Sequence, residues 1–503
     1  MPMRSITRGA VWAAAGAAIG VLSFAGLFSR DSRLHLEFDR DQAGFSTGFH
    51  PVERSGDVTF AWTSATAVMR LADLDRRAAW QCAIRVRSGR GADLTSPRVV
   101  FSVDGVAQGA HPAPAEFEDL PLTLPIRADR QGLTLAIDTV PTFVPGPDDP
   151  RELGVQVDRI SCAPAVSGSL GVPRRAAAAA AGAIMGVVAW ALGLGFFGAG
   201  ALAVLLVAAA VPMAAGLAPY GDYPRLALLL AAWIAAVALL SARLVEWRMG
   251  RPLSTAAAAA IAMSAGLSWL KLLALLHPSK LVIDAVFHAH RLQWVLDGRF
   301  FFTQPMPDGV SFPYAIGLYV VSAPWALVSS DFVALLRIVV VATEAVAMLL
   351  LYPAVLRAWG DRSAAVLAVL FGHLVPLPFV VMGNANLTFA FGQAVALGTL
   401  ALAVALPMSL GVGKPGVLLA AIGLLAFLSH VATFPFLLAA LLALALVGRF
   451  LGGAAERAPA RAIAAAAMAA AVLAVVTYYG HFGEVYQSLD RVLGRATSVA
   501  GLA

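Results

Sequence analysis

Apolar segments of about twenty residues recur along most of this chain, and they constrain its fold more than any other feature. From Ala176 onward they lie at about 176–194, 197–216, 224–244, 255–276, 313–329, 332–356, 363–382, 387–407, 415–433, 434–449 and 460–479. A helix needs roughly 20 residues to cross a bilayer. Only 13% of the 503 residues are charged, against about 25% in soluble domains. The sequence therefore predicts a polytopic α-helical protein that has the lipid bilayer as its solvent.

A further apolar segment, residues 9–28, lies near the amino terminus. Arg4 and Arg8 precede it, the charged run 30–33 follows it, and no clear cleavage site separates the two. This pattern predicts a retained signal anchor over residues 1–29, with the amino terminus in the cytoplasm. The alternative is a cleaved signal peptide, and under either interpretation the next segment is exported.

Residues 30–172 form the one long polar stretch. Alternating runs such as VTFAWT, RVVFSVDG and LTLAIDT are separated there by Gly, Pro and Asp turns. Seven or eight strands of this kind predict an external all-β sandwich or jelly roll. Such domains often bind sugars, but a structural cap over the membrane domain explains the pattern equally well.

Two features of this β domain leave alternatives open. Cys82 and Cys162 both lie in strand-like runs, so they form either a disulfide or two buried thiols, depending on the strand order. The segment 142–155 places acids and prolines beside Arg151. It is interpreted as a rigid loop, with a calcium site as the alternative.

The distribution of basic residues predicts the topology of residues 173–480, the membrane domain. Cytoplasmic loops are rich in Lys and Arg, so the turns that carry these residues should be cytoplasmic and the loop 277–314 external. This assignment requires that 313–329, with Pro313 and Pro324, does not cross the membrane, which gives eleven spans and an external tail at 481–503; twelve spans would invert everything downstream. The basic residues are Arg243, Arg248, Arg251, Arg357, Arg362, Lys414, Arg449, Arg457 and Arg461. The predicted location is the bacterial inner membrane, with the β domain outside.

The external loop 277–314 concentrates the groups that carry chemistry. A helix from about Leu281 to Leu296 would place Asp284, His288 and Arg291 on one face, at i, i+4 and i+7, and Arg299 follows the helix. Transfer of a group from a lipid phosphate needs a base for the acceptor hydroxyl and cations for the departing phosphate. Asp284 is therefore the candidate catalytic residue, and the other three are candidate substrate-binding residues.

Other polar residues come near predicted external helix ends. They are Asn384, Asn386, Gln393, Ser429, His430, Tyr478, Tyr479 and His481. We expect Asn384, Asn386 and His430 to line one cavity with Asp284, where a phosphate or sugar needs hydrogen-bond donors. Glu344 and His373 lie deeper and are either functional groups or a hydrogen-bonded pair between helices.

The residues of the 277–314 loop bear on metal binding, and the net charge of the chain bears on nucleic-acid binding. Asp284, His288 and His290 could supply two or three metal ligands, but no fourth ligand is evident. A divalent metal is therefore an open possibility, and no other cofactor is implied. The net charge is +6 without a basic tract, which argues against a nucleic-acid partner.

At residues 255–480 the chain resembles the GT-C superfamily of glycosyltransferases, which use polyprenyl-phosphate sugars and include the protein mannosyltransferase type. The resemblance rests on Asp284, Phe287-His288, Asp297-Gly298 and Phe312-Pro313-Tyr314. It implies a polyprenyl-phosphate sugar donor, an acceptor that is a glycan, lipid or protein, and Asp284 as the loop carboxylate that acts as base or binds the acceptor. The chain lacks the adjacent acidic pair usual at this position.

Two other functions compete with this one. Eleven spans interrupted by Gly and Pro also suit a transporter or flippase of lipid-linked sugars, although no inverted repeat is evident. A non-catalytic assembly protein could bind sugars through its β domain. Substitution of Asp284 distinguishes them, since only an enzyme should lose transfer activity.

Overall fold

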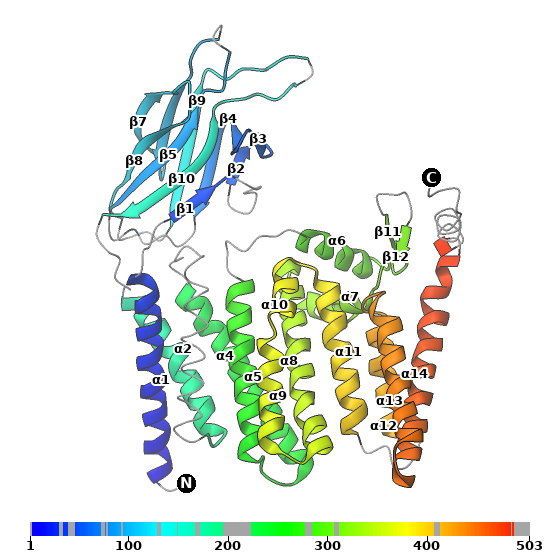
Figure 1. The fold of residues 1–503 in the computed structure, drawn as a ribbon. Helices are drawn as coiled ribbons and strands as arrows, with labels where there is room; N and C mark the ends of the chain where they lie inside the picture. Colours follow the sequence, from blue (N-terminus) through cyan, green and yellow to red (C-terminus); the bar gives the residue numbers. More distant parts are fainter. Residues whose placement is uncertain are drawn as a thin grey trace. The chain divides into compact units, whose positions relative to one another are not determined.

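The computed structural model describes most of the chain. The described residues are 3–29, 34–38, 46–71, 76, 79–91, 94–127, 132–147, 149–165, 172–194, 223–276, 284–305, 311–406, 413–483 and 485–486. The chain divides into two compact units, the first made of Met1–Val187 with Val207–Ala232 and the second of Val188–Leu206 with Trp233–Ala503. Figure 1 labels the helices and strands of both units.

Ten strands form an antiparallel β domain in the first unit, which confirms the predicted all-β character. They are β1 (Leu34–Glu37), β2 (Ser46–Phe49), β3 (Glu53–Ser55), β4 (Val58–Leu71), β5 (Trp80–Arg87), β6 (Arg98–Val103), β7 (Val106–Pro112), β8 (Glu118–Leu124), β9 (Leu133–Val140) and β10 (Gln156–Pro164). The seven longer strands follow the order β7-β6-β9-β4-β10-β5-β8. Strand β4 pairs with β10 at Ala61 and Trp62 and with β9 from Thr66 to Leu71. It therefore joins the two halves of the sheet.

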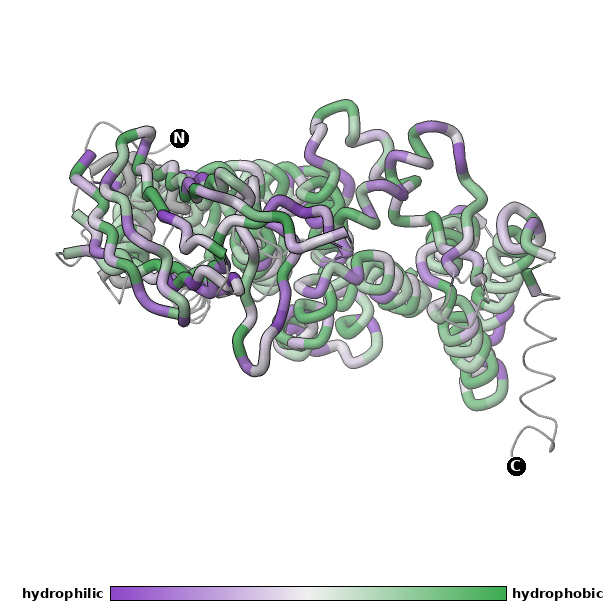
Figure 2. Tube along the Cα trace, turned by 90° about the horizontal axis from the view of Figure 1, so that it is seen from above, coloured by the Kyte–Doolittle hydropathy of each residue, from purple (hydrophilic) through white to green (hydrophobic). Residues whose placement is uncertain are grey.

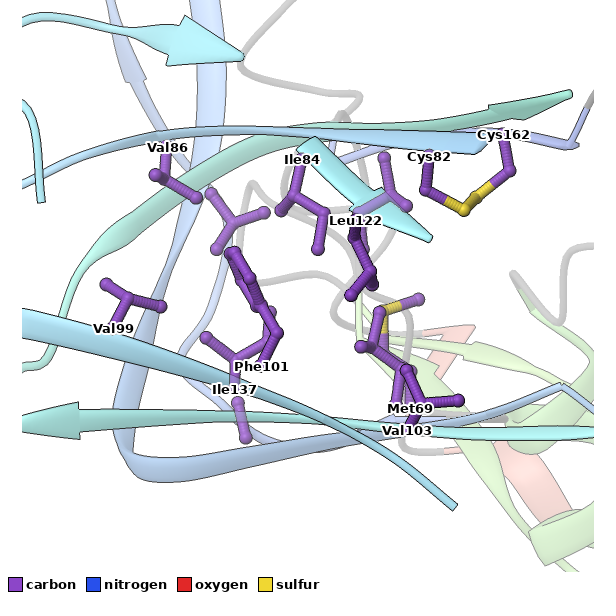
Figure 3. Close-up of a cluster of buried hydrophobic side chains, with 14 of the residues drawn as sticks. Met69, Cys82, Ile84, Val86, Val99, Phe101, Val103, Leu122, Ile137 and Cys162 are labelled. Carbon is purple, nitrogen blue, oxygen red and sulfur yellow. A yellow bond between two sulfur atoms is a disulfide. The ribbon is translucent and has the colours of Figure 1, made fainter. Parts of the chain in front are cut away.

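The hydrophobic core of the β domain lies between these two halves. Every second residue of β5 and β9 is buried, as the pleat of a strand requires. Figure 3 shows Ile84 and Leu122 facing Phe101 and Ile137 across the core. These four side chains are at most 4% exposed.

The two cysteines are bridged. Cys82 of β5 and Cys162 of β10 are direct partners in the antiparallel register, and their sulfur atoms form a disulfide (Figure 3). The strand order, which the sequence does not give, brings them together and decides between the two alternatives.

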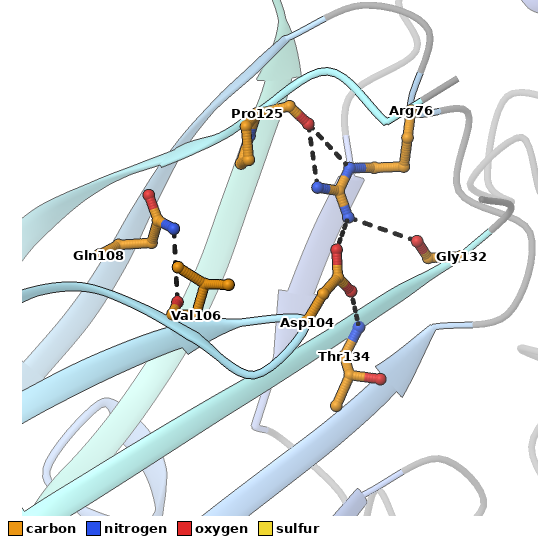
Figure 4. Close-up of polar contacts among 7 residues, drawn as sticks. All are labelled: Arg76, Asp104, Val106, Gln108, Pro125, Gly132 and Thr134. Carbon is orange, nitrogen blue, oxygen red and sulfur yellow. Dashed lines mark hydrogen bonds and ion pairs between the residues drawn. The ribbon is translucent and has the colours of Figure 1, made fainter. Parts of the chain in front are cut away.

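A buried arginine fastens one end of the β domain (Figure 4). Arg76 is 1% exposed and donates from Nη1 to Asp104 at 2.9 Å and from Nη2 to the Pro125 carbonyl at 2.9 Å. Asp104 in turn accepts a hydrogen bond from the Thr134 amide. Because each partner lies in a different loop or strand, this cluster ties three segments together.

Arg151 of the acidic loop 142–155 forms two ion pairs. Arg151 pairs with Asp149 and with Glu53, each at 2.7 Å. The hydrogen bond from Arg151 lowers the pKa of Asp149 to about 2. These ion pairs agree with the rigid-loop interpretation.

Two apolar helices complete the first unit, α1 (Met3–Ser29) and α2 (Val172–Ala191). An added Cβ at Gly16 would lie 2.1 Å from the Gly182 carbonyl oxygen, and one at Gly186 would lie 2.2 Å from that of Trp12. The backbones of α1 and α2 are therefore in contact. Small residues four apart permit this close packing in membrane helices.

The second unit is mainly helical. Helix α4 (Tyr223–Met249) enters it from the first unit. The remaining elements are α5 (Thr255–Leu275), α6 (Ala285–Leu296), β11 (Thr303–Pro305), β12 (Ser311–Pro313), α7 (Gly317–Ser322), η1 (Ala323–Leu327), α8 (Phe332–Trp359), α9 (Arg362–Leu374), α10 (Pro376–Gly383), α11 (Leu387–Ala405), α12 (Lys414–Phe427), α13 (Thr433–Phe450), η2 (Ala454–Glu456), α14 (Arg457–Thr477) and η3 (Tyr479–Phe482). In Figure 1, α6 lies across one end of these helices.

Within the described ranges, seven helical stretches are long and apolar enough to cross a membrane. They are Arg225–Met249, Thr255–Leu275, Phe332–Trp359, Arg362–Gly383, Leu387–Ala405, Thr433–Phe450 and Ala454–Thr477. Four apolar helices are shorter, among them Gly317–Leu327 in the segment predicted not to cross, and the predicted span 197–216 lies outside the described residues. The helix traces are mostly green, the colour of hydrophobic residues, in Figure 2. The chain is therefore a multi-pass membrane protein.

Candidate functional site

Helix α6 positions the candidate site. It begins at Ala285 after Asp284 and ends before Gly298, which adopts φ +80°, a conformation that glycine accepts without strain. Asp284 is exposed, and its side chain forms no capping hydrogen bond. The predicted start at Leu281 lies outside the described residues. The Asp284 carboxylate therefore lies exposed at the amino-terminal end of α6, and no described residue of the helix bonds to it.

Arg291 lies on α6, seven residues after Asp284, and is only 6% exposed. Its guanidinium carbon lies 4.1 Å from the centre of the Trp294 ring and within 6 Å of three more aromatic rings, those of Phe287, Phe302 and Tyr314. Cation–π attraction of this kind stabilises a partly desolvated cation. We call these four rings, together with the guanidinium they surround, the arginine cage.

The guanidinium in the arginine cage is short of hydrogen-bond acceptors. Nη2 makes long contacts with the Thr303 carbonyl at 3.4 Å and with Gln304 Oε1 at 3.3 Å. Nη1 is buried, and none of the described residues accepts a hydrogen bond from it or supplies Arg291 with a carboxylate. Burial lowers the pKa of Arg291. An arginine with a free N–H and no counterion is suited to bind an anion.

His288 lies beneath the surface of the site. It is 2% exposed, and its Nδ1 shares a hydrogen bond of 2.7 Å with the Tyr319 hydroxyl. Burial lowers its pKa to about 4, which a hydrogen bond with the Ala385 backbone partly offsets. The neutral ring therefore links α6 to α7 and to the turn between α10 and α11.

The asparagine pair lies on that turn. Asn384 ends α10 and Asn386 precedes α11, with Ala385 between them at φ +59°. Both asparagines are exposed. The contact of His288 with Ala385 and a hydrogen bond of 3.2 Å between the hydroxyls of Tyr314 and Thr388 hold this turn beside α6. The structure thus brings the Asn384–Asn386 turn next to the helix that carries Asp284.

Arg299 and His430 are placed differently. The Arg299 side chain is exposed just after α6. His430 lies between α12 and α13, with its ring 5.0 Å from the Phe389 ring of α11 and its Nδ1 buried without a partner among the described residues. Burial lowers the pKa of His430. Its ring contacts α11, and no contact recorded among the described residues joins it directly to α6.

Three further hydrogen bonds join segments at the end of the second unit where α6 lies. The Tyr478 hydroxyl, just after α14, donates to the Tyr314 carbonyl, and the Tyr479 hydroxyl donates to the Phe427 carbonyl at 2.8 Å. The Gly317 amide of α7 donates to the Leu428 carbonyl at 2.7 Å. These contacts join the end of α14 to α12 and to the segment before α7, and join α7 to the end of α12.

Sequence reasoning missed the arginine cage. Tyr314 belongs to the Phe312-Pro313-Tyr314 motif, but the approach of Phe302 and Tyr314 to Arg291 depends on β11 and β12, which pair as an antiparallel hairpin. Burial raises the pKa of Tyr314, and the Asp284 charge adds a smaller contribution in the same direction. The signal available in the sequence was the density of aromatic residues on both sides of a lone arginine.

The possible metal site at Asp284 and His288 finds little support in this geometry. The His288 ring is occupied by Tyr319 and the Ala385 backbone. Within the described ranges, no group of three or more His, Cys, Asp or Glu side chains could hold a metal ion. His290 is exposed on another part of α6.

The two deep ionisable residues do not pair with one another, which corrects one of the two interpretations of the sequence. Glu344 of α8 binds Lys271 Nζ of α5 at 2.7 Å, and both side chains are at most 8% exposed. His373 of α9 shares a hydrogen bond of 2.9 Å with Ser264, also of α5. Lys271 was not recognised because it lies 73 residues from Glu344.

Comparison with known proteins gives no family. No family model matches the chain, and no curated protein matches it. Among solved structures, a GH26-CBM35 β-(1,4)-mannanase from Podospora anserina is similar over 27% of this chain and 28% of its own, at 14% identity and a TM-score of 0.18. Dimeric latent PorU from Porphyromonas gingivalis is similar over 28% of this chain and 13% of its own, at 11% identity and a TM-score of 0.19. Scores this low carry no argument about fold or function.

Proposed function

We propose that the chain is a GT-C-type glycosyltransferase that moves a sugar from a polyprenyl-phosphate donor to an acceptor hydroxyl on the external face of the bacterial inner membrane. The observation that carries the proposal is the arginine cage on the same helical face as an exposed carboxylate. Arg291 has a buried N–H without an acceptor and no carboxylate partner among the described residues. Asp284 precedes it on the same helix, exposed and uncapped.

The spacing on α6 suits both roles. Seven residues are about two helical turns, or a rise of about 10 Å, which places Asp284 and Arg291 on one face of α6. Tyr314, whose ring centre lies 5.9 Å from the guanidinium carbon, also interacts with the Asp284 charge. In the proposed reaction the Asp284 carboxylate takes the proton of the acceptor hydroxyl, whose oxygen bonds to the anomeric carbon. The bond from that carbon to the phosphate oxygen breaks, and its electron pair leaves with the phosphate.

The other candidate residues complete the site in this proposal. Arg291 holds the departing phosphate through Nη1, and the exposed Arg299 adds a second positive charge at the end of α6. The Asn384–Asn386 turn, held beside α6, offers amide donors to the sugar. Neutral His288 keeps this turn against α6. His430, in the turn between α12 and α13, would contact the donor only at the far side of the site, beside Phe389 of α11.

Detection of a product tests the proposal. Purified protein is incubated with a panel of polyprenyl-phosphate sugars and candidate glycan, lipid and peptide acceptors, with and without EDTA. We expect release of the polyprenyl phosphate together with a glycosylated acceptor for at least one donor. The EDTA arm shows whether a divalent metal is needed. Absence of release with every donor and acceptor class would contradict the proposal.

The Lys271–Glu344 pair is the observation that favours a rival function. Ionisable residues inside membrane proteins commonly mark transport pathways, and this pair lies between two candidate spans. A flippase would carry a fluorescent lipid-linked sugar across the membrane of proteoliposomes without forming a product. Transfer without translocation favours the enzyme, and translocation without transfer favours the flippase.

The eleven-span topology belongs to the same proposal and is tested by cysteine labelling. Because both native cysteines are bridged, new single cysteines can be labelled in the native background. We expect His290→Cys to react with an impermeant thiol reagent outside the cell, and Arg362→Cys to react only after the membrane is opened. Labelling of residue 362 from outside would overturn the eleven-span arrangement.

A further inference from the structure

A cavity of about 620 Å³ lies between α8, α10, α11 and α13, away from the arginine cage. Most of its lining is apolar, with Met348, Met382 and Phe389 among the contributors. Three polar residues, Glu344, Gln393 and Thr433, interrupt this lining. Its size is that of a cavity for a small molecule.

Glu344 is the unusual member of the lining. Its side chain is 2% exposed, and Oε1 accepts a hydrogen bond of 2.7 Å from Lys271 Nζ. Oε2 is buried, and no hydrogen-bond donor among the described residues reaches it. A buried acceptor without a partner is unfavourable, and more so when it is charged. Glu344 therefore brings to the lining of the cavity an acceptor for which the described residues supply no donor.

We propose that this cavity binds a neutral long-chain amphiphile whose hydroxyl donates a hydrogen bond to Oε2 of Glu344. The neutral character follows from Lys271, which already compensates the carboxylate charge at 2.7 Å. A ligand ammonium would add an unbalanced charge inside the membrane, which is costly. A phosphate or carboxylate headgroup would be repelled by Glu344. This ligand is thus distinct from the polyprenyl-phosphate donor of the proposed reaction.

The amphiphilic character follows from the lining and the way into the cavity. Phe436 lines the cavity and is 76% exposed on α13, a helix long and apolar enough to cross the membrane. An exposed phenylalanine on such a helix faces lipid. The cavity is therefore open to the hydrocarbon phase, from which an alkyl chain can enter with its hydroxyl leading toward Glu344.

Photolabelling of the full-length protein in nanodiscs tests the proposal. The probes are an octanol that carries a diazirine and the matched diazirine-bearing octane, and labelled peptides are identified by mass spectrometry. A hydrogen bond to a charged group contributes about 1.5–3 kcal/mol. We therefore expect the alcohol to label Phe389 and Phe436 at least about tenfold more efficiently than the alkane. Equal labelling by the two probes, as when water satisfies Glu344, or labelling by neither, overturns the proposal.

Two variants locate the bound hydroxyl. Ala440→Trp fills the cavity from α13 while leaving Glu344 and Lys271 intact, and it should abolish labelling by both probes. Glu344→Gln alone would leave Lys271 unpaired, so the second variant is the double substitution Lys271→Met/Glu344→Leu, since replacing both members of a buried ion pair by apolar residues is often tolerated. It should keep alkane labelling and remove the preference for the alcohol. A preference that survives the double substitution shows that Glu344 is not the acceptor and overturns the proposal.

Discussion

Replacing Arg291 by methionine separates a role in binding substrate from a role in holding the fold. The substitution removes the positive charge and keeps an unbranched side chain among the four aromatic rings of the arginine cage. Methionine itself makes favourable contacts with aromatic rings, of about 0.3–1.5 kcal/mol. The variant should therefore retain much of the packing around residue 291.

The expected magnitudes follow from the hydrogen bonds of Arg291. Its two internal hydrogen bonds are long, 3.3 and 3.4 Å, and Nη1 has no partner among the described residues. Losing them should change the free energy of unfolding by only about 1 kcal/mol. Losing a hydrogen bond to a phosphate should cost about 1.5–3 kcal/mol. That is a loss of roughly 10- to 150-fold in kcat/KM for the lipid-phosphate sugar.

The assay combines initial rates of sugar transfer with thermal unfolding of the purified protein. Arg357→Met is the matched control, because this exposed arginine lies in the last turn of α8, outside the candidate site. Arg291→Met should lower kcat/KM with a nearly unchanged melting temperature, and the control should alter neither. A melting temperature lowered by many degrees with unchanged kinetics would show that Arg291 serves the fold, and the phosphate assignment would fail.

Three further predictions concern stability. The disulfide closes a loop between residues 80 apart, so Cys82→Ala/Cys162→Ala should lower the free energy of unfolding of the β domain by roughly 4 kcal/mol. Urea unfolding measures this, and an unchanged urea midpoint would contradict it. Arg76→Met should cost about 3–5 kcal/mol by leaving Asp104 buried without its cation, and Arg76→Met/Asp104→Asn should restore part of that stability. The folded protein holds the pKa of His288 at about 4, below the ~6.5 of an unfolded histidine. The free energy of unfolding should therefore be highest above pH 6.5 and decline as the pH falls toward 4, by roughly 2 kcal/mol at pH 5. Melting temperatures measured against pH should lose this part of the slope in His288→Gln, and an unaltered slope would refute the burial argument.

Local sequence patterns predicted the local elements of the fold. The alternation of β5 and β9 is a period of two that strands require, and segment length identified the seven membrane-length helical stretches that the structure describes. The bridge between Cys82 and Cys162 could not be predicted, because it depends on β5 and β10 being neighbours. Strand order is set by the packing of the whole domain and leaves no local signal.

In the candidate site, too, only the features that depend on local spacing could be predicted. The placement of Asp284 and Arg291 on one helix follows from a spacing of seven residues. The arginine cage does not, because Tyr314 reaches Arg291 only through the β11–β12 hairpin. Similarly, Glu344 was recognised as an intramembrane acid, but its partner on α5 lies 73 residues away in sequence. Contacts between distant segments are the part that a single sequence conceals.

The most direct test of the proposed function is the transfer rate of Asp284→Asn compared with that of Asp297→Asn. Both aspartates flank α6, one at its beginning and one at its end, and both are exposed, so the two substitutions perturb similar environments. Loss of a general base commonly slows a reaction by about 10²- to 10⁴-fold. With an accepted polyprenyl-phosphate sugar, Asp284→Asn should lose activity by that factor while Asp297→Asn stays near the wild-type rate. Full turnover by Asp284→Asn together with an inactive Asp297→Asn would contradict the assignment of the catalytic carboxylate.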